Sequence, residues 1–114
     1  MAVKEANDDD LRSLIFQHDM VIVMYLIENC AVCNAIGRLY LKQSDRPIYN
    51  NIIFLKINAA ESVVAAKIVG ETGNPFIVSY KTGFLVRCEE VKTEKKLLKI
   101  LTELKDEHRP NFGE

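Results

Sequence analysis

The chain of 114 residues has no tryptophan and contains only three cysteines, three prolines and five glycines. So small and odd a number of cysteines argues against a secreted scaffold held by several disulfides. No apolar run approaches the roughly 20 residues that a membrane-spanning helix needs, so we expect no membrane partner. The opening residues MAVKEANDDD lack the apolar centre of an export signal. The sequence therefore predicts a cytoplasmic protein, and export stays open in case a signal peptide has been removed.

An excess of charge of either sign is also missing. Fifteen basic and 16 acidic residues leave a formal net charge of −1, which argues against a nucleic-acid partner bound by bulk charge. Hydrophobic residues make up 48% of the chain and charged residues 27%, as in soluble globular proteins. This length allows one ordinary core. We expect a single domain over residues 1–106 and a loose tail over 107–114.

Hydrophobic periodicity predicts alternating helices and strands. The continuous apolar run VIVMYLI at 21–27 indicates a central strand covered on both faces. Before this strand, the patterns predict a short strand at 3–6 and a helix that is capped by Asn7 or Asp8 and ends at His18. After it, they predict a helix from the Cys30–Cys33 segment to before Pro47, a strand at 52–57 and a helix at 62–69. Two strands at 76–80 and 84–89 follow, and a last helix is capped by Thr93.

This order predicts a mixed sheet with helices on both faces. Two β-α-β crossovers are expected to make their strands parallel neighbours, and a hairpin adds an antiparallel strand. The hairpin is expected to turn through the three residues Lys81-Thr82-Gly83, with glycine in the left-handed conformation. The predicted fold class is α/β, with four or five strands.

The segment Cys30-Ala31-Val32-Cys33 lies between the strand at 21–27 and the following helix. Unpaired N–H groups and the positive end of the dipole at a helix N-terminus favour a thiolate, so we expect the pKa of Cys30 below the free-cysteine value. Redox exchange is the first interpretation, and inert packing is the second. A metal site would need four ligands, which a second copy of the motif could complete. Packing is the expected role of Cys88, which shares strand parity with Phe84 and Val86.

The chain resembles the thioredoxin superfamily over about residues 3–106. The apolar strand before the CxxC motif, the strand Phe54 to Asn58, the pair Asn74-Pro75 before the next strand, and Lys81-Thr82-Gly83 before the last strand carry the resemblance. It implies a thioredoxin-like three-layer α/β/α sandwich and a thiol–disulfide oxidoreductase with no bound cofactor. In the cytoplasm its direction would be the reduction of protein disulfides.

The resemblance also implies roles for individual residues. Cys30 would be the attacking thiol, and Cys33 the resolving thiol that releases the substrate. Pro75 would follow a cis peptide bond and lie beside the dithiol, and Lys56 would have an electrostatic or proton-transfer role near it. The residues that would contact a substrate are Asn29, Ala31, Val32 and Asn74.

Six positions depart from the family pattern. Asn29 replaces a tryptophan, Ala31-Val32 replaces Gly-Pro, and Arg38 replaces a helix-kinking proline. The glycine that usually follows the last strand corresponds to about Val91. Met24 occupies the place of a buried aspartate that assists the resolving cysteine, and a thioether cannot move a proton. The chain is therefore expected to be a divergent member.

Three functions from different classes remain open in the sequence. The first is the oxidoreductase, with disulfide-containing proteins as substrates and a thioredoxin-reductase-like protein or another dithiol as reductant. The second is a binding or chaperone-like module that uses the groove without turnover, which the loss of the aspartate at Met24 favours. The third is a dimer bridged by metal through two CxxC motifs.

Overall fold

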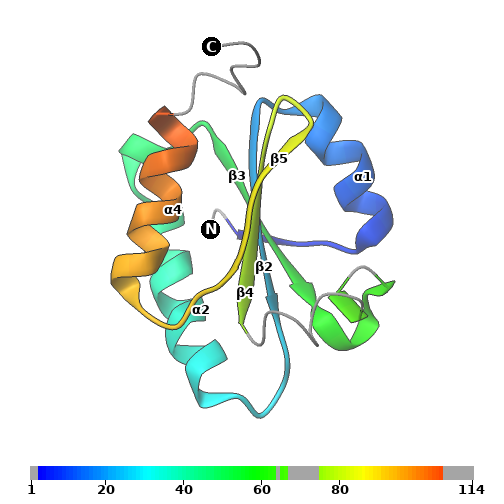
Figure 1. Cartoon of the computed structure of the whole chain (residues 1–114), viewed down its shortest axis with the longest axis vertical. Coiled ribbons are helices and arrows are strands. Elements are labelled where there is room, and N and C mark those ends of the chain that lie inside the picture. The colour runs from blue at the N-terminus through cyan, green and yellow to red at the C-terminus, as the bar shows by residue number, and fades with distance from the viewer. Residues whose placement is uncertain (1–2, 64, 67–74, 107–114) are drawn as a thin grey trace.

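The structure is a computed structural model that describes residues 3–63, 65–66 and 75–106. A five-stranded sheet forms the middle layer, with α2 and α4 on one face and α1 on the other (Figure 1). This confirms the predicted α/β class. The elements are β1 (Val3–Glu5), α1 (Asp8–Gln17), β2 (Met20–Leu26), α2 (Ala31–Ser44), β3 (Ile52–Asn58), β4 (Phe76–Lys81), β5 (Phe84–Glu90) and α4 (Glu94–Asp106), with 3-10 turns at Pro47–Tyr49 and Ala59–Glu61.

Two predicted segments fall partly or wholly outside the described residues. Of the helix expected at 62–69, residues 64 and 67–69 lie outside, and the described part contains only its first turn. That turn is capped by Ser62, whose hydroxyl accepts from the N–H of Ala65 at 3.0 Å. The tail expected at 107–114 lies entirely outside.

The strands lie in the order β1-β3-β2-β4-β5, and β1, β3 and β2 are parallel. The crossover through α2 therefore runs as predicted. The second expected crossover is wrong, because β4 is antiparallel to β2. The reason is that β3 ends and β4 begins at the same edge of the sheet: Asn58 is in register with Leu26, and Phe76 with Tyr25.

The central strand β2 is covered on both faces, as its apolar run predicts. Residues 20–25 are all buried, and their side chains alternate between two core clusters. The cluster under α2 and α4 includes Met24, Ile36, Tyr40, Leu97, Ile100, Leu101 and Leu104. The cluster under α1 includes Leu11, Val23, Tyr25, Leu55, Phe76 and Val78.

The helix caps follow the expected residues. Asn7 caps α1 in a reciprocal capping box with Asp10, at 2.8 Å and 3.2 Å. Thr93 caps α4 by accepting from the N–H of Lys96 at 3.2 Å. The inward side of α2 carries Cys33, Ile36 and Tyr40, all buried, as predicted.

The turn between β4 and β5 differs from the expected three-residue link. Lys81 and Phe84 pair across it, so only Thr82 and Gly83 form the loop. Both have positive φ, at 49° and 84°, as a type I′ hairpin requires. A Cβ on Gly83 would also lie 2.9 Å from the ring of Phe16, so both backbone angle and space favour glycine here.

The predicted side-chain parity of Cys88 is wrong. A register shift between Ser79 and Tyr80 places an extra residue on β5. As a result Val86 packs against the cluster under α2 and α4, while Cys88 packs against the cluster under α1. Cys88 is half-buried, which agrees with a packing role.

Ion pairs join β5 to α4 on the outer face. Arg87 lies 2.8 Å from Glu103, and Lys96 lies 2.8 Å from Glu89. The hydrogen bond from Lys96, with the charges of Lys96 and Arg87, lowers the pKa of Glu89. The side chains of both ion pairs are partly exposed. The pairs therefore contribute more to the orientation of α4 than to its stability.

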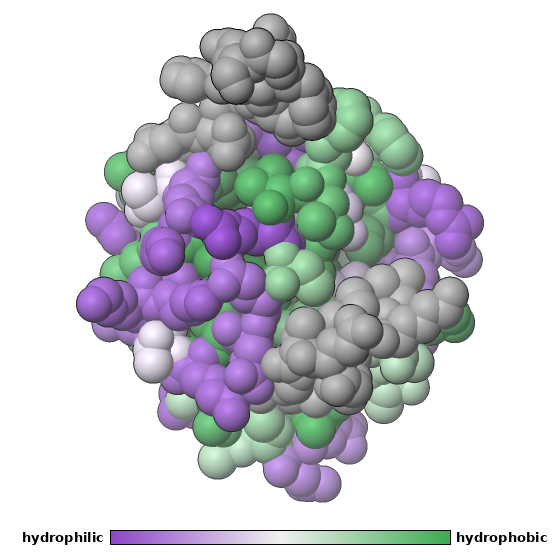
Figure 2. Space-filling model, in the orientation of Figure 1, coloured by the Kyte–Doolittle hydropathy of each residue, from purple (hydrophilic) through white to green (hydrophobic). Residues whose placement is uncertain are grey.

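The visible surface is unevenly polar. Hydrophilic side chains cover α4, and an apolar area lies over the hairpin end of β5 (Figure 2). Phe84 and Leu85 are 56% and 58% exposed there. This end of the sheet is opposite to the end at which α2 begins (Figure 1).

Two buried tyrosine hydroxyls provide a matched test of core hydrogen bonding. The Tyr40 hydroxyl donates to the carbonyl oxygens of Ile22 and Leu55, at 2.9 Å and 2.8 Å. The Tyr25 hydroxyl is buried and has no hydrogen-bond partner among the described residues. We expect Tyr40→Phe to lower the free energy of unfolding by about 1–2 kcal/mol. Tyr25→Phe, the control, removes an unsatisfied group and should leave stability unchanged or raise it. Urea titration of both variants checks this, and equal losses would contradict it.

Candidate active site

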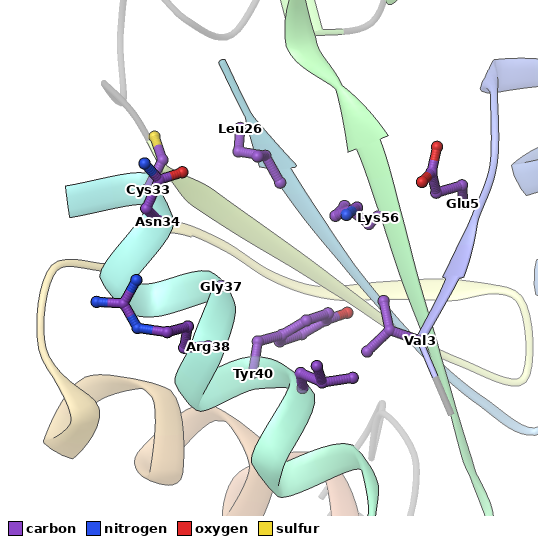
Figure 3. A pocket seen from close by; sticks show the side chains of 10 residues that line it. Val3, Glu5, Leu26, Cys33, Asn34, Gly37, Arg38, Tyr40 and Lys56 are labelled. Atoms are coloured by element: carbon purple, nitrogen blue, oxygen red, sulfur yellow. The ribbon is translucent and has the colours of Figure 1, made fainter. Parts of the chain in front are cut away.

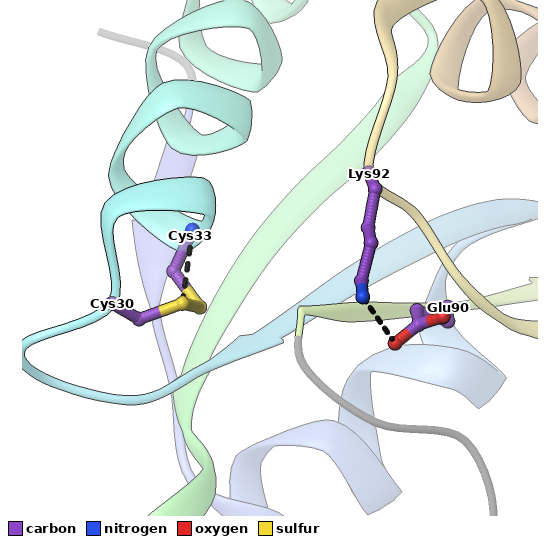
Figure 4. The surroundings of a disulfide bond; sticks show 4 residues. All are labelled: Cys30, Cys33, Glu90 and Lys92. Carbon is purple, nitrogen blue, oxygen red and sulfur yellow. Dashed lines mark hydrogen bonds and ion pairs between the residues drawn. A yellow bond between two sulfur atoms is a disulfide. The ribbon is translucent and has the colours of Figure 1, made fainter.

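The CxxC motif lies where the chain leaves β2 and enters α2. Cys30 and Cys33 form a disulfide, with their Cα atoms 5.1 Å apart (Figure 4). Cys30 is the N-cap residue of α2, and its Sγ accepts a hydrogen bond from the N–H of Cys33 at 3.1 Å. A donor in that place favours the thiolate over the neutral thiol.

The two cysteines differ in their access to solvent. Cys30 is half-buried, whereas Cys33 is fully buried on the inward side of α2. Ala31 and Val32, between them, are exposed in the first turn of the helix. An incoming sulfur atom therefore reaches Cys30 before Cys33, as the predicted order of attack requires.

Asn29 turns the chain into the motif with a left-handed backbone, at φ 57°. Asparagine is among the residues that tolerate this conformation, whereas a β-branched residue is strained in it. Asn29 is exposed, so its conformation and not its burial accounts for its place before Cys30.

Pro75 is buried at the start of β4. Its carbonyl accepts from the N–H of Val91 at 2.9 Å, which ties the entry of β4 to the exit of β5. The next residue, Phe76, stacks on Tyr25 with ring centroids 4.7 Å apart. Pro75 is thus at the same edge of the sheet as the dithiol. Asn74 lies outside the described residues, and so does the geometry of the bond that joins it to Pro75.

Lys56 lies on β3, half-buried, beside a cavity of about 420 Å³ that Cys33 also lines (Figure 3). The same lysine lines an adjoining hollow of about 270 Å³. Lys56 and Cys33 therefore line the same cavity, and the role of Lys56 toward the dithiol stays a prediction. The other cavity residues are Val3, Glu5, Leu26, Asn34, Gly37, Arg38, Tyr40 and Leu41.

Three polar residues near the dithiol were missed in the sequence. Glu90 is the last residue of β5 and Lys92 follows the strand; the two form an ion pair at 3.4 Å and appear across from the disulfide in Figure 4. Glu5, on β1, lines both hollows beside Lys56. No local pattern marks these residues, because only the order of the strands brings them to this edge.

The described residues contain no group of three or more His, Cys, Asp or Glu side chains that could hold a metal ion. Within the same described part, no helix is long and apolar enough to span a membrane.

Comparisons with known proteins identify the fold. No family model and no curated protein sequence matches the chain. Among solved structures, spinach chloroplast thioredoxin f (short form) is 24% identical over 92% of this chain and 95% of its own, with a TM-score of 0.81. Malassezia sympodialis thioredoxin is 23% identical over 91% and 94%, with a TM-score of 0.79. Mitochondrial thioredoxin 3 of Saccharomyces cerevisiae is 24% identical over 90% and 95%, with a TM-score of 0.77.

The chain therefore has the thioredoxin fold along most of its length. Within this fold, a Cys-x-x-Cys pair joined as a disulfide at the start of α2 supports thiol–disulfide oxidoreductase activity.

The left-handed backbone conformation of Asn29 predicts how substitutions at this position change the free energy of unfolding. We expect Asn29→Val to lower the free energy of unfolding by about 1–2 kcal/mol, because a β-branched residue resists positive φ. Asn29→Gly should stay within about 1 kcal/mol of the parent, since glycine has no Cβ to clash. Thermal unfolding of the two variants makes the comparison. Equal stability of both would show that Asn29 does not need this conformation.

Proposed function

We propose that this protein is a thiol–disulfide oxidoreductase that reduces disulfides in other proteins. The Cys30 thiolate attacks a substrate disulfide, and one substrate sulfur leaves as a thiol. The mixed disulfide is then attacked by Cys33, which releases the second substrate thiol and forms the Cys30–Cys33 disulfide. An external dithiol, such as a thioredoxin-reductase-like protein, restores the reduced pair.

The difference in burial between the two cysteines carries this proposal. A half-buried N-cap thiol with a backbone donor 3.1 Å away suits attack on an outside disulfide. A fully buried partner three residues later meets only a sulfur already bound to Cys30. Inert packing would not require one cysteine of the pair to face the solvent.

The surrounding residues would guide the substrate and the second step. Asn29, Ala31 and Val32 are exposed beside Cys30, where an extended segment could lie against them and against Pro75 and Asn74. Lys56 would favour the Cys33 thiolate with its positive charge, across the cavity that both line. A cytoplasmic location agrees with the reductive direction.

Trapping experiments test the order of attack. Cys33→Ser should accumulate mixed disulfides with protein substrates, because the resolving thiol is gone while Cys30 still attacks. Cys30→Ser should reduce insulin disulfides at less than about 1% of the parent rate, since loss of an activated nucleophile removes the first step. Cys88→Ser is the matched control and should keep the parent rate. Non-reducing gels and an insulin reduction assay measure these outcomes.

Two results would contradict the proposal. Full activity of Cys30→Ser would show that the nucleophile is wrongly assigned. A parent protein that binds partners but neither reduces disulfides nor traps them through Cys33→Ser would be a binding module.

A further inference from the structure

In the proposed exchange reaction, the proton of Cys33 has no assigned acceptor. An inference about that acceptor rests on the proposed function. Cys33 must lose its proton before its sulfur can attack Cys30. It is fully buried, and burial in apolar surroundings disfavours a thiolate. Met24, at the position where the resemblance places a carboxylate, is fully buried and offers only a thioether.

The sheet register places another carboxylate in the same row as Met24. Glu5 on β1 is in register with Lys56 on β3, and Lys56 is in register with Met24 on β2. Side chains in one row share a face of the sheet. Met24 belongs to the core cluster under α2, so Glu5 and Lys56 lie on the face that α2 and Cys33 cover. Each step between strands is about 5 Å.

The cavity joins these groups to Cys33. It is lined by Cys33 and Arg38 on α2, by Lys56 on β3 and by Glu5 on β1. In Figure 3 Lys56 is seen between Cys33 and Glu5. Arginine does not accept protons in proteins, and lysine is ordinarily protonated at neutral pH. Among the described residues that line this cavity, Glu5 is therefore the one carboxylate. Because it is exposed, it can exchange protons with bulk water.

Other acidic groups nearby are less suited to the role. Glu90, across from the disulfide in Figure 4, is paired with Lys92 at 3.4 Å and does not line the cavity. Glu28 and Glu61 line the adjoining hollow with Glu5 and Lys56, but not the cavity that Cys33 lines. Glu89 ends the same row on β5, where ion pairs with Lys96 and Arg87 hold it. The Tyr40 hydroxyl, which also faces the cavity, donates to backbone carbonyls.

We propose that Glu5 accepts the proton of Cys33 through water in the cavity that both residues line. In the mixed disulfide, the Cys33 proton passes to Glu5 and the thiolate forms a bond with Cys30 Sγ. The bond between Cys30 Sγ and the substrate sulfur breaks, and its electron pair leaves with the substrate thiolate, which takes up a proton from water. Glu5 then returns its proton to water. The dithiol is oxidised by two electrons and the substrate disulfide is reduced.

A disulfide dye separates the two chemical steps. Reduced protein with Cys88→Ser releases one thionitrobenzoate from 5,5′-dithiobis(2-nitrobenzoate) when Cys30 attacks, and a second when Cys33 resolves the adduct. We expect Glu5→Gln to slow the second release about tenfold near pH 7, as loss of a proton acceptor does, and to leave the first release unchanged. The difference between the two proteins should narrow as the pH rises, because hydroxide then removes the Cys33 proton without the carboxylate.

Matched variants keep the result specific. Glu5→Asp retains a carboxylate and should restore most of the second rate, and Glu61→Gln should leave both phases unchanged. Urea midpoints of these variants check that β1 stays in place. An unchanged second phase in Glu5→Gln, or equal slowing in Glu61→Gln, would overturn the role of Glu5. A parent that never releases the second dye molecule would instead overturn the proposed oxidoreductase.

Discussion

Burial of β2 on both faces is the constraint on which the rest of the structure depends. Residues 20–25 are enclosed between the α1 layer and the α2–α4 layer, so the strand has a fixed register and a fixed end. The chain leaves that end through the left-handed Asn29 and enters α2 at Cys30. The position of the dithiol therefore follows from the core. A rigid strand and a capped helix hold the two sulfur atoms, while the exposed first turn leaves one of them accessible.

The same packing separates the roles of two chemically identical side chains. Cys30 and Cys33 are one helical turn apart, yet the first faces solvent and the second faces the core. A backbone N–H stabilises the outer sulfur, and the cavity over Lys56 serves the inner one. Met24 on β2 is in register with Lys56 on the neighbouring strand β3, and Lys56 is in register with Glu5 on β1. The charged groups of this row therefore lie one and two strands away from Met24. The departures from the family pattern thus leave the fold intact, and Met24 supplies no carboxylate beside Cys33.

Local sequence patterns predicted most of the architecture, because apolar runs, helix periodicity and caps are local signals. The direction of β4 could not be predicted, since it depends on pairing with the distant strand β2, for which there is no local sequence signal. The face of the sheet on which Cys88 lies could not be predicted either, because the register shift between Ser79 and Tyr80 has no local sequence signal. In the site, Cys30, Cys33 and Lys56 stood out by residue type. Glu5 did not, because its register against Lys56 is set by strand pairing between distant segments.

The reduction potential of the Cys30–Cys33 pair tests the central claim most directly. The protein would be equilibrated in dithiothreitol and glutathione buffers, and its free thiols counted with Cys88 replaced by serine. A reversible two-electron couple near about −270 mV, the range of a cytoplasmic disulfide reductant, is the expected result. A pair that stays reduced in every buffer would contradict the account and leave a thioredoxin-fold binding module. A potential near about −120 to −180 mV would contradict the reductive direction and indicate an oxidase or isomerase.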